Sequence, residues 1–151
     1  MSTFTQLGDL LEHVRNVHEQ AAACCAQAKY STDDRLNLLL DYFRHWEQRL
    51  ERFLDTLERQ ERKAFLYTWV QFAPTEDVDH ALSALTHAQD APPETLVNRC
   101  FDLREQILAL IDLLADRLKA PDVRDQLSKL AEIERKAARD LGIADIMRHD
   151  A

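Results

Sequence analysis

The sequence predicts an all-α protein, an antiparallel four-helix bundle with short extra helices between the second and third long helices. The first observation behind this prediction is the scarcity of glycine, of which the 151 residues include 2. Sheet-based folds need many tight turns, and tight turns need residues that accept a positive φ. The second observation is an apolar spacing of three and four residues along four long segments, which is typical of amphipathic helices. We expect residues 1–151 to form a single helical domain.

Signals for helix starts divide the chain into these four segments. We expect long helices at about residues 6–29, 31–62, 93–118 and 121–141. Thr3 and Gln6 have the spacing of a capping box before the first helix, and Ser31 and Asp34 repeat it before the second. Pro93 suits the first turn of the third helix. The connections near residues 30 and 121 are only a few residues long, which makes neighbouring helices antiparallel.

The stretch between the second and third helices contains the densest aromatic run of the chain. Its aromatic residues are Phe65, Tyr67, Trp69 and Phe72. Either the second helix continues through this run or a short helix crosses the end of the bundle, and residues 77–86 indicate another short helix. The aromatic side chains suit a lid over the bundle or a dimer interface, where aromatic residues are enriched.

Each long helix has an apolar seam, which is the stripe of apolar residues expected to face the core. One polar residue interrupts this seam near the middle of each helix. These residues are His18, Glu47, Arg104 and Glu134. Each lies about 15–20 Å along the axis from its helix start at 1.5 Å per residue, so all four are expected near the mid-plane. A buried charge is costly unless it is paired, so these side chains should contact one another or bind something.

Two interpretations of these four residues compete. In the first, Arg104 lies between Glu47 and Glu134 in a salt-bridge cluster that His18 completes, and no cofactor is bound. In the second, His18, Glu47 and Glu134 ligate iron or manganese, as carboxylates and histidines on facing helices can. Arg104 favours the first interpretation because a permanent cation competes electrostatically with a metal ion.

The four helices, the longer excursion between the second and third, and the mid-bundle carboxylates resemble the ferritin-like superfamily of rubrerythrins and bacterioferritins. The resemblance covers nearly the whole chain but lies in architecture. It implies a di-iron centre with Glu-x-x-His on two helices and single glutamates on the other two. The run 132–135, Glu-Ile-Glu-Arg, has arginine in place of that histidine, and the second helix offers no such motif either. The expectation is a ferritin-like relative without the complete metal site.

Composition restricts the partners. The net charge of −8 disfavours nucleic acid and anionic membranes, since both bind clustered cations. No apolar run approaches the roughly 20 residues that span a bilayer. Cys24, Cys25 and Cys100 are odd in number, which fits reduced thiols, and no secretory signal is visible. We expect an acidic, cytoplasmic protein.

The sequence therefore favours a non-catalytic binding or interaction protein, acting as a homodimer or with a protein partner. One rival is a divergent metal-binding oxidoreductase or storage protein built on the polar seam residues. Another is an adaptor that uses the aromatic segment 65–72, which requires Trp69 to be exposed to solvent.

Overall fold

The computed structural model describes residues 4–27, 34–59, 69–71, 75–118 and 120–140 and belongs to the all-α class. The described residues form five helices and two short strands. The helices are α1 (Leu7–Gln27), α2 (Asp34–Arg59), α4 (Glu76–Thr86), α5 (Pro93–Arg117) and α6 (Pro121–Asp140). The strands are β1 (Phe4–Gln6) and β2 (Trp69–Gln71).

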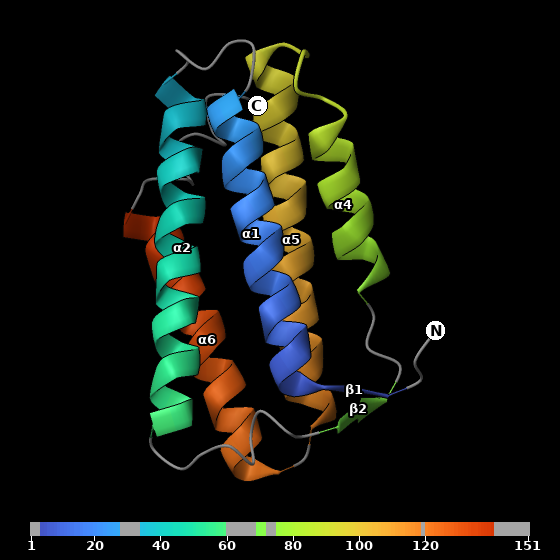
Figure 1. Ribbon diagram of the computed structural model, residues 1–151, viewed down its shortest axis with the longest axis vertical. Helices are drawn as coiled ribbons and strands as arrows, with labels where there is room; N and C mark the ends of the chain where they lie inside the picture. Colours follow the sequence, from blue (N-terminus) through green and yellow to red (C-terminus); the bar gives the residue numbers. More distant parts are fainter. Residues whose placement is uncertain (1–3, 28–33, 60–68, 72–74, 119, 141–151) are drawn as a thin grey trace.

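The four long helices α1, α2, α5 and α6 extend along the long axis of the molecule (Figure 1). The pair α1 and α2 runs in opposite directions, as does the pair α5 and α6 (Figure 1). Helix α1 packs chiefly against α2, and α5 packs against α6. Helix α2 also contacts both α5 and α6, and the shorter α4 lies against α5 and α1. The short connections near residues 30 and 121 thus join antiparallel neighbours.

The helix boundaries follow the start signals in the sequence. Helix α5 begins at Pro93, where the missing N–H is no loss because the first turn has no acceptor for it. Helix α4 matches the short helix expected at 77–86, and its first turn carries Glu76, Asp77 and Asp79. Carboxylates there interact favourably with the positive end of the helix dipole. The end of the second helix beyond residue 59 lies outside the described residues.

The expectation of helix through the aromatic run is wrong for residues 69–71, which form β2. This strand pairs antiparallel with β1, and Thr5 lies opposite Val70. Aromatic and β-branched residues favour a strand when a partner supplies the ladder hydrogen bonds, and the partner comes from residues far away in sequence. Val70 is buried, whereas Trp69 is 60% exposed. The other three aromatic residues of the expected interface, Phe65, Tyr67 and Phe72, lie outside the described residues.

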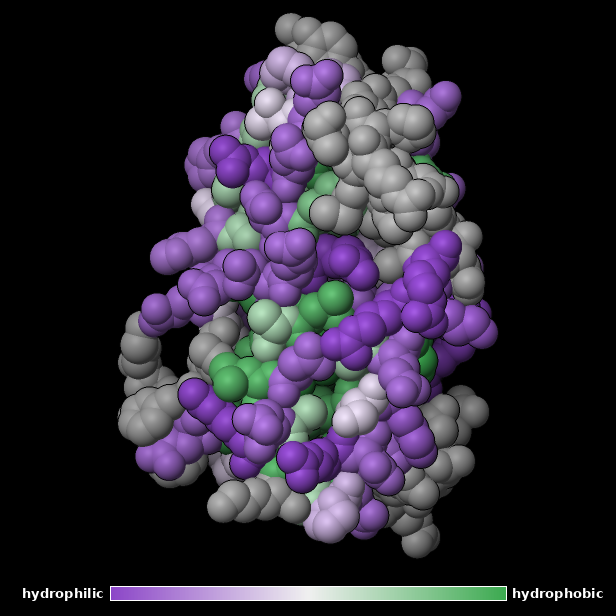
Figure 2. All heavy atoms as spheres, turned by 180° about the vertical axis from the view of Figure 1, so that it is seen from behind, coloured by the Kyte–Doolittle hydropathy of each residue, from purple (hydrophilic) through white to green (hydrophobic). Residues whose placement is uncertain are grey.

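The core follows the predicted seams on three of the four long helices. On α1 the described residues at helical spacing on the inward face are all buried: Leu7, Leu11, Val14, His18, Ala21 and Cys25. The rear surface is mostly hydrophilic, with a hydrophobic area in its lower half (Figure 2). Among the described helices, none has the combined length and hydropathy needed to cross a membrane.

Candidate functional site

The four predicted polar residues differ in how deeply they are placed. His18 on α1 and Glu134 on α6 are each 1% exposed. The side chain of Arg104 on α5 is 17% exposed, and Glu47 on α2 is only partly buried. Each lies 11 to 13 residues into its helix, about 17–20 Å along the axis, so they occupy a similar level.

Arg104 and Glu134 form an ion pair between α5 and α6. The Nε atom of Arg104 lies 3.2 Å from Oε1 of Glu134. Within the described residues, Nε of Arg104 and Oε2 of Glu134 have no hydrogen-bond partner, so the contact is electrostatic rather than a well-aligned hydrogen bond. Burial raises the pKa of Glu134 to about 8, and the charge of Arg135 acts in the opposite direction. Burial also lowers the pKa of Arg104. Burial therefore disfavours the charged form of each group, and the charged form of each depends on the opposite charge beside it.

Glu47 does not join this pair, contrary to the cluster that the sequence predicted. No ion pair links it to Arg104 in the described part of the chain. Burial raises the pKa of Glu47, and the next largest effect is repulsion from Glu19 on α1. The reason is helix phase: Tyr42 and Trp46 take the inward positions of α2. Large aromatic side chains gain more from burial than a carboxylate does, so they rotate Glu47 to the edge.

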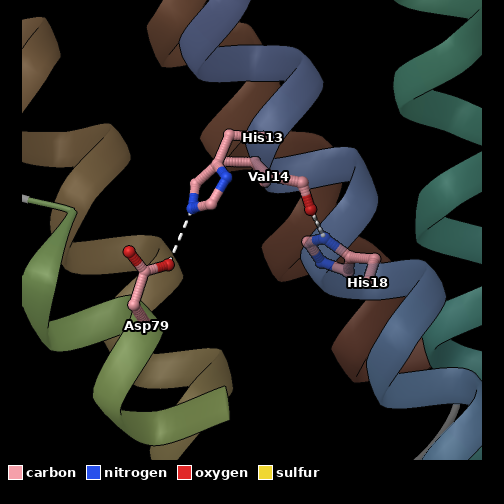
Figure 3. A network of polar contacts seen from close by, with 4 residues as sticks. All are labelled: His13, Val14, His18 and Asp79. Atoms are coloured by element: carbon pink, nitrogen blue, oxygen red, sulfur yellow. Dashed lines mark hydrogen bonds and ion pairs between the residues drawn. The ribbon is translucent and has the colours of Figure 1, made fainter. Parts of the chain in front are cut away.

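His18 is held by its own helix and by aromatic rings. Its Nδ1–H donates to the carbonyl oxygen of Val14 at 2.8 Å (Figure 3). The imidazole centroid lies 5.9 Å from that of Phe43 and 5.2 Å from that of Trp46, both edge-on. Burial lowers the pKa of His18 to about 3, while the hydrogen bond from Nδ1 opposes this shift. The ring is neutral at pH 7 and acts as a packed core residue.

The other histidine of this region, His13, points away to α4. Its Nε2 atom lies 2.7 Å from Oδ1 of Asp79 (Figure 3). Both side chains are substantially exposed, so this contact links α1 to α4 at the surface.

Sequence reasoning missed two polar atoms in the interior of α2. The hydroxyl of Tyr42 and Nε1 of Trp46 are buried, and neither has a hydrogen-bond partner among the described residues. The available signal was that Tyr42, Phe43 and Trp46 form an aromatic stripe with helical spacing. That stripe marks the true inward face of α2.

These residues do not fit the di-iron centre that the ferritin-like resemblance implies. The ring of His18 packs against Phe43 and Trp46, one oxygen of Glu134 faces Arg104, and Glu47 lies among surface charges. The described residues bring no three side chains of His, Cys, Asp or Glu into a group able to hold a metal ion. The middle of the bundle is instead occupied by an ion pair and an aromatic-packed histidine.

The chain matches no known family model, no curated protein and no solved structure.

Proposed function

We propose that this chain is a non-catalytic binding protein: an antiparallel four-helix bundle of α1, α2, α5 and α6, with ferritin-like ancestry and no complete di-iron site. It acts in the cytoplasm as a homodimer, through its surface rather than through its core. The observation that supports this function is the buried contact of 3.2 Å between Arg104 and Glu134.

The ion pair opposes metal binding at the middle of the bundle by simple electrostatics. The guanidinium of Arg104 keeps its proton at any physiological pH. At about 4 Å and an effective dielectric constant of 20, a divalent ion would be repelled by this cation by about 8 kcal/mol. Attraction of the metal ion by Glu134 would offset this repulsion only if Glu134 were fully ionised, and burial favours its protonated form. A metal here would have to displace Arg104 from Glu134.

Metal analysis tests this function against the alternative of a divergent iron or manganese protein. Purified untagged protein is incubated with iron, manganese and zinc, desalted, and examined by elemental analysis and thermal melting. The proposal expects no stoichiometric metal and an unchanged melting temperature, because tight binding to the native state must raise it. Near-stoichiometric metal that is lost in Glu134→Gln but kept in Asp79→Asn, a surface carboxylate control, would overturn the proposal.

A second candidate function, an adaptor that uses the aromatic segment, is favoured by the exposure of Trp69. Among the described residues, Trp69 is the one exposed large hydrophobic side chain, at 60%. It is fixed in place because its neighbour Val70 is buried and its strand pairs with β1. Neither outer edge of this two-stranded ribbon has a neighbouring strand within the described residues. We assign the occupant as the ribbon of a second copy, which would extend the ladder to four strands.

Self-association measured through Trp69 tests this surface. The chain has 2 tryptophans, so Trp46→Phe leaves Trp69 as the only fluorophore of its kind. We expect its emission to shift to shorter wavelength as the protein concentration rises, in parallel with dimer formation in analytical ultracentrifugation. Trp69→Thr should weaken the dimer at least tenfold, whereas Gln71→Thr, on the same face of β2, should have little effect. A monomer at every concentration, or a dimer that Trp69→Thr leaves intact, contradicts this candidate.

A further inference from the structure

Two buried thiols on different helices contact each other away from the polar site. Cys25 lies in the last turn of α1, and Cys100 lies in the first half of α5. Their Sγ atoms are 3.7 Å apart, and both side chains are free thiols in the core. The helices that carry them share few other contacts.

We propose that Cys25 and Cys100 are an oxidation site, at which a peroxide converts the two thiols into a reversible disulfide that ties α1 to α5. A disulfide needs its sulfur atoms about 2.05 Å apart, so the two Sγ atoms must approach by about 1.7 Å. A side-chain rotation combined with a small shift of the end of α1 supplies a movement of this size.

The contact also assigns the order of events. Either thiol can be the hydrogen-bond donor in this contact. The contact lowers the pKa of Cys25 and raises that of Cys100. Cys25 also lies in the last turn of α1, where local opening admits peroxide, so Cys25 is the thiolate that attacks. Its sulfur bonds to one peroxide oxygen, the O–O bond breaks, and the departing hydroxide takes up a proton to become water. Cys25 is then a sulfenic acid.

The second step closes the bond. The sulfur of Cys100 attacks the sulfur of the sulfenic acid, its proton joins the departing hydroxide, and a second water leaves. In total two thiols and one hydrogen peroxide give one disulfide and two waters, with two electrons passing from sulfur to oxygen. A thiol reductant reverses the modification through a mixed disulfide.

Access to the buried pair comes from the position of Cys25. Helix ends open locally far more often than helix centres, and Cys25 is in the last turn of α1. Hydrogen peroxide is small enough to enter during such openings. The resolving thiol is already in contact, so the sulfenic acid is trapped as a disulfide before further oxidation.

The neighbouring Cys24 is not the disulfide partner of Cys25. Adjacent residues have Cα atoms about 3.8 Å apart, which is shorter than the 4.4–6.8 Å that a disulfide requires. Burial raises the pKa of Cys24, and a hydrogen bond with the side chain of Gln89 opposes this shift. Cys24 therefore offers a matched control next to the reactive pair.

The test treats the folded full chain with a small excess of hydrogen peroxide and follows its mass and melting temperature. We expect wild type and Cys24→Ala to lose about 2 Da, with peptide mapping placing the bond between Cys25 and Cys100, and dithiothreitol to restore the mass. The disulfide closes a loop across 75 residues, so the melting temperature should rise by on the order of 10 °C. Cys25→Ala and Cys100→Ala should show neither change, and circular dichroism establishes that they are folded. Over-oxidation to sulfinic acid, a bond that involves Cys24, an intermolecular disulfide, or a folded wild type that stays unmodified would each overturn the proposal.

Discussion

Protonation of His18 is expected to destabilise the folded protein in mild acid. The neutral ring donates through Nδ1 to the carbonyl of Val14 and is enclosed by Phe43 and Trp46. A second proton would make the buried ring of His18 positively charged. No carboxylate is among the groups that shift the pKa of His18. The folded state therefore resists protonation, while the unfolded chain accepts a proton at the ordinary pKa of histidine.

The size of the effect follows from the shift. Burial lowers the pKa of His18 from 6.5 to about 3. A lowered pKa in the folded state means that its contribution to stability is complete above about pH 6.5 and is lost as the pH falls toward 3. Each pH unit in this window removes about 1.4 kcal/mol, and the whole window about 5 kcal/mol. This is a large share of the 5–15 kcal/mol that holds a typical domain together.

Urea unfolding followed by circular dichroism, at a series of pH values, measures this loss. Between about pH 6.5 and about pH 4.5, the free energy of unfolding of wild type should fall by about 2–3 kcal/mol more than that of His18→Leu, which cannot titrate. The exposed histidine variant His45→Gln should retain the steep wild-type dependence. Parallel pH profiles for wild type and His18→Leu would refute the reasoning, because His18 would then titrate alike in both states.

Three further substitutions are expected to separate core packing from polar contacts in the same unfolding assay. Tyr42→Phe removes a buried hydroxyl that has no partner among the described residues, so stability should stay level or rise by up to about 1 kcal/mol; a clear loss would reveal a partner for that hydroxyl. Phe43→Ala empties a fully buried ring position and should cost about 3–5 kcal/mol, and a cost below about 1 kcal/mol would place Phe43 outside the core. His13→Ala breaks an exposed contact with Asp79 and should change stability by less than about 1 kcal/mol; a larger loss would mean that α4 depends on this contact.

Sequence reasoning located the helices well because their signals are local. Apolar spacing and start signals lie within one segment, and the seam on α1 was correct at every described position. The strand at residues 69–71 could not be found in this way, because its partner lies at residues 4–6. A three-residue strand has almost no periodic signal of its own, and only the long-range pairing shows it.

The polar site was predicted in part for a related reason. His18, Arg104 and Glu134 lie on seams whose described apolar members are largely buried, so the predicted phase of these three helices was correct. On α2 two inward faces fit the helical spacing, one that includes Glu47 and one that includes Trp46. The two faces are offset by one residue along the helix. Only packing against the other helices decides between them, and it favours the aromatic side chains. The contact between Cys25 and Cys100 was likewise beyond reach, since spacing within each helix says nothing about which cysteines meet.

The most direct test of the account is a double-mutant cycle on the ion pair, using Glu134→Gln, Arg104→Met and the double variant. Arg104 and Glu134 are expected to satisfy each other's charge in the core. Glu134→Gln should then cost about 3 kcal/mol, because it leaves a largely buried guanidinium unpaired. The double variant should be more stable than the sum of the two single losses implies, with a coupling of about 2 kcal/mol. Additive losses would contradict the account, since the two side chains would then contribute to the core independently.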